Sequence, residues 1–205
     1  MNFLIKSLSI QPNIWFFSLL LFILFYNLKI IFLTKNSLVI FFVLTPTLWT
    51  FQEYFAHYIL MHKINKLKKI HMKHHNNPKD NKKIFIPILF TSIFGFINLS
   101  ILYIFTNKNI LIINFCGNIV CYILFEYCHY ISHKNQKNNL LNELKNFHLI
   151  HHNKINKEYS NFGFTCAAWD IIFGTINTKY YNYKYYYILL IPYPIIPFII
   201  FKFIK

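Results

Sequence analysis

The chain has 205 residues, enough for one domain with a sizeable core. Its hydrophobic fraction of 56%, with 20% aromatic residues, is high for a soluble globular protein, and its formal charge of +15 rests on lysine without any arginine. The lysines alternate with apolar runs of membrane length, so the charge indicates a membrane face and argues against a nucleic-acid-binding protein.

Four apolar segments approach or exceed the roughly 20 residues that a helix needs to cross a bilayer. These predicted spans lie at 14–33, 38–60, 84–105 and 110–131. Short joins at 34–36 and 106–109 make them two antiparallel hairpins, and Pro46 predicts a kink in the second span. We therefore expect an all-α integral membrane protein with a single domain over 1–205, in which the first apolar run is an anchor rather than a removed leader.

Small and polar residues inside the third and fourth spans predict close helix packing there. They are Gly95, Asn98, Asn114, Gly117 and Asn118. The four cysteines have no metal-type spacing, so we expect them to act as small apolar residues. The apolar run at 185–203 contains three prolines and is expected to be embedded in the membrane without a clean crossing.

The segments 61–83 and 132–182 are predicted to form a helical cap on one membrane face, with a helix around 140–153. The first holds eight lysines and the second holds five between Lys134 and Lys157, whereas each short join holds one. By the positive-inside rule the cap faces the cytosol.

Every histidine lies in or next to this cap, in two sets of nearly equal spacing. The first set reads H-x4-H then H-x2-H-H, and the second reads H-x3-H then H-x2-H-H. The ten residues are His57, His62, His71, His74, His75, His129, His133, His148, His151 and His152.

The spacing predicts a site for more than one metal ion. Residues three and four apart share a helix face, so a trio such as His71, His74 and His75 can aim its imidazoles into one pocket. His57 and His62 lie about 140° apart on an ideal helix of 3.6 residues per turn, so at least one is expected at a distorted helix end. Neutral imidazole binds iron, zinc and copper, and affinity alone does not choose among them.

The number and placement of the histidines favour a redox enzyme. A structural zinc site needs only four ligands, usually rich in cysteine, and a transporter predicts polar ligands at mid-membrane depth. A dinuclear site at the membrane face would meet a lipid substrate. Glu53 and Glu126, near the ends of apolar spans, and Asp170 are candidates to accept hydrogen bonds from the distal N–H groups of the ligands.

The four boxes in this order resemble the fatty acid hydroxylase/sterol desaturase superfamily of membrane diiron oxygenases, and are most similar to fatty acid (sphingolipid) 2-hydroxylases. The stretches at 49–54, 162–165, 169–170 and 173–175 look like that family's surroundings of the first and last boxes. The resemblance covers 48–175. Tyr58 departs from it, because the family commonly has a basic residue there.

The resemblance implies that all ten histidines ligate two metal ions, iron in the active enzyme, with zinc able to occupy purified protein. It implies 2-hydroxylation of a fatty acyl chain, within ceramide, from O2 and two electrons. Such enzymes lie in the endoplasmic reticulum membrane and take electrons from cytochrome b5 and its reductase. The sequence lacks the His-Pro-Gly-Gly haem motif, so a separate donor is expected.

Other readings of the same pattern stay open. A sterol C-4 methyl oxidase, a sterol desaturase or a carotenoid hydroxylase bears similar boxes, and a metal-binding membrane protein without catalysis is the non-enzymatic alternative.

Overall fold

The structure is a computed structural model that describes residues 40–134, 139–153 and 159–177. Within these ranges all regular structure is helical, which confirms the expected fold class at that level. The predicted span at 14–33, the apolar run at 185–203 and the last residues of the cap lie outside the described residues.

The predicted span at 38–60 corresponds to an unbroken helical segment with a π-helical part at each end. It consists of η2 (Ile40–Leu44), α4 (Thr45–Phe55) and η3 (Ala56–Met61). Pro46 stands in the first turn of α4, directly after η2. A proline is tolerated there because its missing N–H falls where the regular α-helical hydrogen bonds have not yet begun.

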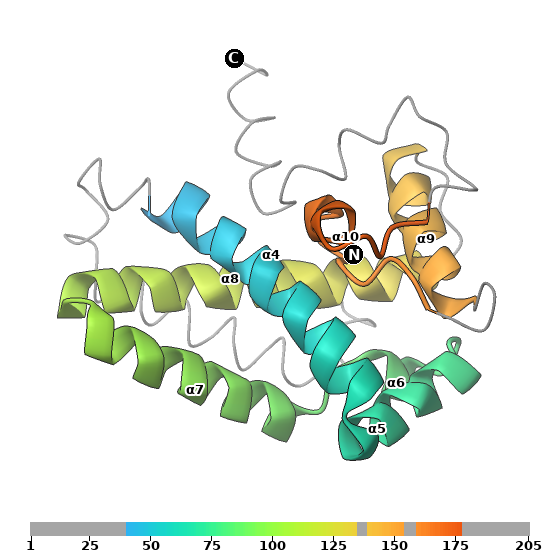
Figure 1. The fold of residues 1–205 in the computed structure, drawn as a ribbon, viewed down its shortest axis with the longest axis horizontal. Helices are drawn as coiled ribbons and strands as arrows, with labels where there is room; N and C mark the ends of the chain where they lie inside the picture. Colours follow the sequence, from blue (N-terminus) through green and yellow to red (C-terminus); the bar gives the residue numbers. More distant parts are fainter. Residues whose placement is uncertain (1–39, 135–138, 154–158, 178–205) are drawn as a thin grey trace, which may run out of the picture.

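The third and fourth predicted spans form an antiparallel hairpin of α7 (Ile88–Phe105) and α8 (Lys108–Ser132) (Figure 1). The Asn107 side chain caps α8 by accepting a hydrogen bond from the Ile110 N–H (3.0 Å). The third span begins later than expected, because Pro87 favours an extended residue before it and thus separates α7 from α6 (Asn81–Ile84). Within the described ranges, α8 alone is long and apolar enough to cross a membrane, and α7 is a shorter apolar helix.

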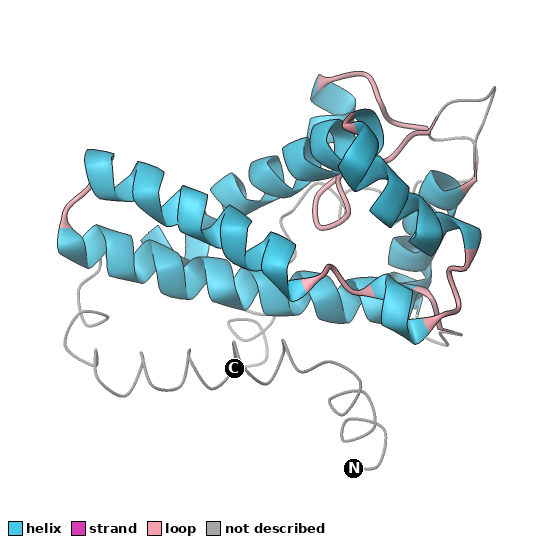
Figure 2. Ribbon diagram, turned by 90° about the horizontal axis from the view of Figure 1, so that it is seen from below, coloured by secondary structure: helices cyan, strands magenta, loops and turns pink. Residues whose placement is uncertain are grey.

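The predicted cap lies at the end of the molecule away from the α7–α8 turn. It contains α5 (Asn65–Asn76), α6, α9 (Asn139–His152) and α10 (Ala168–Ile172). Figure 1 shows the turn at the left end and α5, α6 and α9 at the right, and the separation persists in Figure 2. The helix expected around 140–153 is confirmed as α9.

Helices α4 and α8 pack closely at Gly117, as predicted. A Cβ on Gly117 would lie 2.7 Å from Cγ2 of Thr45, and the side-chain amide of Asn114 donates to the Thr45 hydroxyl (3.1 Å). The same prediction for Gly95 is wrong, because a Cβ there meets nothing within 4 Å. Cys116 and Cys121 are buried free thiols in this region, as expected of small apolar residues.

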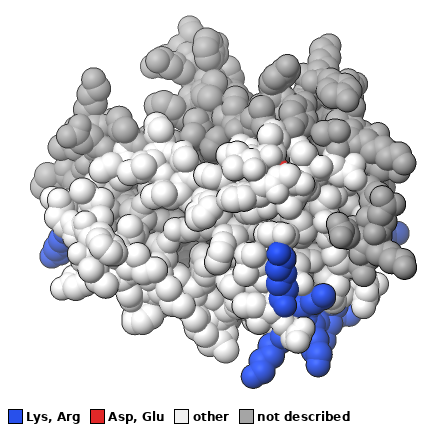
Figure 3. All heavy atoms as spheres, viewed as in Figure 1, with Lys and Arg blue, Asp and Glu red and all other residues white. Residues whose placement is uncertain are grey.

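The two ends of the molecule carry different surfaces. Helix α7 exposes large apolar side chains, including Leu89, Phe96 and Ile104. Lysine side chains gather over α5 in the space-filling view (Figure 3). The exposed lysines of this region, which we call the α5 lysine surface, are Lys63, Lys66, Lys68, Lys69, Lys73, Lys79 and Lys83.

Candidate metal centre

Four helical segments deliver the ten histidines to one place. His57 lies in η3 and His62 ends it, while α5 carries the first H-x2-H-H box. Helix α8 carries His129 and ends at His133, and α9 carries the second H-x2-H-H box in its last turns.

The π-helical segment η3 explains the unusual H-x4-H spacing. A π-helix repeats its hydrogen bonds from residue i to i+5, so residues five apart come to the same side. The Ile64 N–H bonds to the Ile59 carbonyl in this i to i+5 manner (3.3 Å). His57 and His62 consequently share one face, with ring centroids 5.1 Å apart. The helix distortion expected from the sequence is present.

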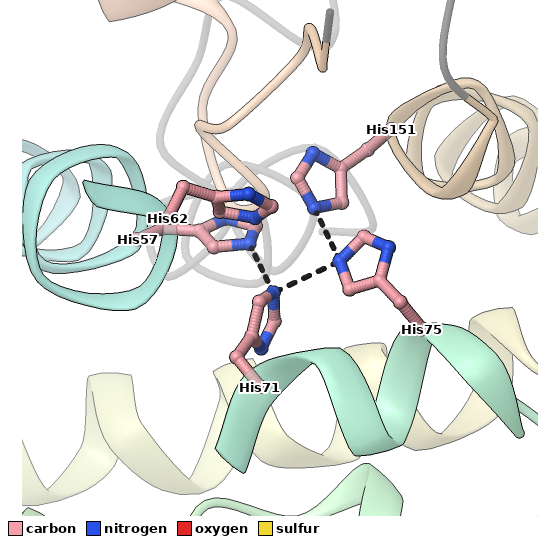
Figure 4. A group of neighbouring side chains, drawn as sticks. All are labelled: His57, His62, His71, His75 and His151. Atoms are coloured by element: carbon pink, nitrogen blue, oxygen red, sulfur yellow. Dashed lines mark hydrogen bonds between the residues drawn. The ribbon is translucent and has the colours of Figure 1, made fainter. Parts of the chain in front are cut away.

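The histidines form two groups of five, and within each group the candidate ligand nitrogens lie within 4.8 Å of one another. Group one consists of His57, His62, His71, His75 and His151 (Figure 4). Group two consists of His74, His129, His133, His148 and His152.

Each H-x2-H-H box is divided between the two groups. The pair four residues apart, such as His71 and His75, enters one group, while the middle residue, His74, enters the other. The expectation that a trio fills one pocket is therefore wrong in detail, because the middle imidazole is turned away from the axis of its i, i+4 partners. The two groups adjoin, with the rings of His75 and His152 stacked at 4.3 Å between centroids.

The nitrogen positions fit a bound cation better than hydrogen bonds among the rings. In group one the Nε2 atoms of His57 and His71, of His71 and His75, and of His75 and His151 lie 3.0–3.1 Å apart, as the dashed lines in Figure 4 mark. Each Nε2 offers a single in-plane position, so His71 and His75 cannot bond to two neighbours at once. Two nitrogens at about 2.1 Å from one ion and at right angles would lie about 3 Å apart.

Group two repeats this arrangement. Neighbouring Nε2 atoms lie 3.2 Å apart between His74 and His129, 3.4 Å between His129 and His133, 2.9 Å between His133 and His148, and 3.0 Å between His148 and His152. Both groups therefore fit one metal ion each, held by nitrogen donors.

Backbone carbonyls set the tautomers of two group-one histidines. The Nδ1–H of His57 donates to the Phe162 carbonyl (2.7 Å), and that of His151 donates to the Ser160 carbonyl (2.8 Å). A carbonyl can only accept, so Nδ1 carries the proton and Nε2 presents its lone pair inward.

Burial keeps the imidazoles in the neutral form that binds metal. Desolvation, together with neighbouring imidazoles, lowers the pKa of His74, His133 and His152 to about 3. Desolvation also holds the pKa of His148 and His151 well below the usual value. These rings are ready to ligate at neutral pH without first losing a proton.

The three candidate carboxylates are buried, but they contact loops and helices rather than imidazoles. Glu53 accepts from the backbone N–H (2.9 Å) and the hydroxyl of Thr165. Glu126 accepts from the Tyr122 hydroxyl (2.9 Å) and the Ile86 N–H (3.2 Å). The expected direct bond from a ligand's distal N–H is thus absent for these bonds of Glu53 and Glu126.

Asp170 reaches a ligand through one peptide unit. Its carboxylate accepts from the N–H groups of Phe162 (2.8 Å) and Gly163 (2.7 Å), and the Phe162 carbonyl accepts from His57. Burial raises the pKa of Asp170 to about 6, and the hydrogen bonds from Thr175, Gly163 and Phe162 oppose that rise.

Sequence reasoning missed the loop at 159–165 as a wall of the centre. Tyr159 packs against His62, His75 and His151, and Phe164 packs against His129 and His148. The carbonyls of this loop could not be found from the sequence, since every residue has one. The aromatic residues at this spacing are the signal that was available.

A cavity of about 360 Å³ reaches the histidines from between α4, α5, α7 and α8. Imidazoles of both groups form part of its wall, including His57 and His71 from group one and His74, His129 and His148 from group two. Most of the remaining wall is apolar, with Trp49, Ile70, Phe90, Ile93 and Phe125 among its residues. The arrangement suits an apolar molecule held against both candidate metal positions.

Comparison with known proteins places this geometry in context. Residues 42–175 match the model of the family described as fatty acid hydroxylase. The chain is 31% identical over 139 residues to the dihydroceramide fatty acyl 2-hydroxylase FAH1 of Arabidopsis thaliana, covering 64% of this chain and 58% of that protein. It is 30% identical over 146 residues to the ceramide very long chain fatty acid hydroxylase scs7 of Schizosaccharomyces pombe, covering 66% and 42%.

A mammalian protein and a solved structure are similar as well. The fatty acid 2-hydroxylase of Mus musculus is 29% identical over 149 residues, covering 66% of this chain and 39% of its own length. The solved structure of full-length scs7p, in which only the hydroxylase domain is visible, has a TM-score of 0.65 at 22% identity and covers 76% of this chain and 62% of its own. The chain thus spans little more than half the length of these curated relatives, or less, and shares the fold of the solved domain.

Proposed function

Because the chain belongs to the fatty acid hydroxylase family, we propose that it is a membrane-bound, metal-dependent hydroxylase acting at the 2 position of a lipid acyl chain. The substrate class is a fatty acyl chain, most readily one in ceramide. Relatives named as dihydroceramide or ceramide fatty acyl hydroxylases support this choice.

The observation that carries the proposal is the apolar cavity that ends on both histidine groups. A lipid acyl chain has no polar group to bind, so apolar burial must hold it in place. The cavity places such a chain against His57 and His71 of group one and His74, His129 and His148 of group two. The surrounding walls exclude water from the reacting carbon.

We assign the resident metals as two iron ions, one for each group of five histidines, with zinc able to replace iron in purified protein. Bound iron would supply the oxidising chemistry with O2 that an unactivated C–H bond requires. The histidines hold and orient it, and the carbonyls of Phe162 and Ser160 fix the donor nitrogens of His57 and His151.

The electrons would come from an external donor, cytochrome b5 with its reductase. The α5 lysine surface supports an acidic protein partner, because α5 itself carries His71, His74 and His75. Complementary charge guides such a partner to the helix nearest the metals.

The proposed location is the endoplasmic reticulum membrane, with several spans and the histidine groups at the cytosolic face. The exposed apolar face of α7 and the long apolar helix α8 support membrane contact, and the lysines support a cytosolic cap. Any further spans would come from the residues outside the described ranges.

The test is a lipid profile of a host that lacks its own 2-hydroxylase and expresses this chain together with cytochrome b5. We expect 2-hydroxylated ceramides to appear and to be missing with His152→Ala at equal expression. Unchanged sphingolipids at confirmed expression and metal content would reject the proposed substrate. Altered sterols or carotenoids in the same extracts would then identify one of the alternative hydroxylases or desaturases, and no altered lipid at all would favour a metal-binding protein.

A further inference from the structure

The two histidine groups differ in how their rings are held from outside. In group one, His57 and His151 each donate an Nδ1–H to a carbonyl of the loop at 160–162. In group two, the Nδ1 atoms of His74, His129 and His152 are buried without a hydrogen-bond partner in the described part of the chain. His75 shares that condition in group one.

Asp170 fixes the loop that supports group one. Its two carboxylate oxygens accept from the N–H groups of Phe162 and Gly163 at 2.8 and 2.7 Å, and Oδ1 also accepts from the Thr175 hydroxyl at 2.6 Å. The carboxylate is fully buried. A charged acceptor with three donors holds these peptide units more firmly than neutral hydrogen bonds do.

The loop is shaped for this approach. A Cβ on Gly163 would lie 2.3 Å from the Cys166 carbonyl oxygen and 2.9 Å from the Asp170 carboxylate, so a larger residue could not take this place without a backbone shift. The preceding Asn161 has a positive φ of 57°, and its N–H bonds to the Thr175 carbonyl (3.0 Å). Asn161 is also 2% exposed, which leaves the loop little freedom.

These contacts form one path from Asp170 to a metal position. Asp170 holds the Phe162 peptide, the Phe162 carbonyl holds His57 Nδ1, and His57 Nε2 points at the group-one nitrogens. A ring that is oriented before the metal binds loses less freedom on binding, and its hydrogen-bonded Nδ1–H makes Nε2 a stronger donor.

We propose that Asp170 is a positioning residue that acts through the Phe162 peptide on His57 and makes group one the tighter of two unequal metal sites. Group one fills first when metal is supplied and empties last when metal is removed. The inference rests on the proposed dimetal function, but it concerns metal affinity and not the lipid product.

The size of the effect follows from known outer contacts of metal ligands, whose loss costs roughly 10- to 100-fold in affinity. Asp170→Asn keeps the shape of the side chain but turns an NH2 group toward a backbone N–H. We therefore expect group one to weaken at least about tenfold, while group two keeps its affinity.

The experiment uses the full chain in detergent, stripped of metal and titrated with Zn²⁺ against a competing chelator, with bound metal counted by mass spectrometry. The natural protein should show two affinity classes. His71→Ala should remove the tight class and His133→Ala the weak class, which assigns each class to its group. Co²⁺ absorption in the same proteins gives a second readout of the coordination at group one.

A merely structural role for Asp170 would lower both affinities together or lower the yield of folded protein. Glu126→Gln is the matched control, because it removes the charge of another buried carboxylate that touches Tyr122 and Ile86 and not the loop. It should leave the tight class unchanged.

Thr175→Val keeps the test decisive if Asp170→Asn fails to fold. It removes one donor to Asp170 at nearly constant shape and should weaken the tight class in the same direction by a smaller factor, whereas Thr175→Ser should not. A single affinity class in the natural protein, or a tight class that stays unchanged in Asp170→Asn and Thr175→Val, would overturn the proposal. Absence of a 2-hydroxylated lipid would leave these metal measurements unaffected, so the two failures can be told apart.

Discussion

At the scale of single residues, the centre depends on which ring nitrogen faces inward. His57 and His151 present Nε2 because a carbonyl occupies Nδ1. The rings that lack such a partner depend on packing, as between His75 and His152, whose rings stack at 4.3 Å. A histidine can therefore serve this centre only if its neighbours also fix its orientation.

Replacing one candidate ligand tests this at the residue scale. We expect His152→Ala to lose at least about 100-fold in hydroxylation and to lose metal from group two, because a removed donor nitrogen costs more than a removed outer contact. Activity and bound metal are measured on membranes with equal amounts of inserted protein.

The neighbouring Asn153→Ala is its matched control. The Asn153 side chain is exposed and donates only to the Leu149 carbonyl at the end of α9 (2.9 Å), so activity and metal content should stay close to those of the natural protein. Equal activity of His152→Ala and Asn153→Ala would remove His152 from the ligand set.

At the scale of helices, two departures from regular packing place the ligands. The π-helical η3 brings His57 and His62 to one side, and the contact at Gly117 sets how closely α4 approaches α8. Since α4 leads directly into η3 and α8 carries His129, the spacing of these helices positions ligands of both groups.

Gly117→Ala tests the helix contact. The new methyl would lie 2.7 Å from Thr45 Cγ2, so we expect a loss of about 1–3 kcal/mol, measured as a lower thermal midpoint in detergent. Adding Thr45→Ser removes that Cγ2 and keeps the hydroxyl that Asn114 reaches, so the double variant should recover part of the loss.

The control for this prediction is Gly95→Ala in α7. Its Cβ has open space, so the change should be neutral or add up to about 1 kcal/mol through helix propensity. If both glycine variants behave alike, close packing is not what Gly117 provides.

At the scale of the whole molecule, an apolar end and a histidine-bearing end are joined by α4 and α8. The apolar residues of α7 suit lipid, while the lysines over α5 suit an aqueous face (Figures 1 and 3). The ten buried imidazoles lie where these two environments meet, and their stability in the fold depends on bound metal.

Removal of metal should therefore destabilise the whole cap. An ion present at a thousand times its Kd adds about 4 kcal/mol to the stability of the folded state. For a chain of this size each kcal/mol corresponds to roughly 2–4 °C, so chelation should lower the thermal midpoint by on the order of 10 °C. The double variant His71→Ala/His133→Ala should respond much less to the chelator, and an equal response would show that the chelator acts elsewhere.

The proposed orientation gives a second prediction at this scale. With the native cysteines replaced, Lys69→Cys on α5 should react with a membrane-impermeant maleimide from the cytosolic side of sealed vesicles. Lys108→Cys at the α7–α8 turn should react only from the opposite side. Labelling of both positions from one side would contradict the proposed topology.

The sequence by itself determined which residues meet and in what kind of helices. Its apolar runs predicted α7, α8 and the helical segment ending at Met61, because hydrophobic length decides such elements locally. Its repeated spacing predicted that the ten histidines belong to one centre and that the H-x4-H box needs a distorted helix.

Only the tertiary structure decided how those residues are shared out. The division of each H-x2-H-H box between two groups depends on the relative positions of α5, α8 and α9, which no local pattern encodes. The route from Asp170 to His57 runs through backbone groups that are chemically the same at every residue, so only folding selects Phe162 and Gly163 for it. The cavity likewise exists only where four helices leave space between them.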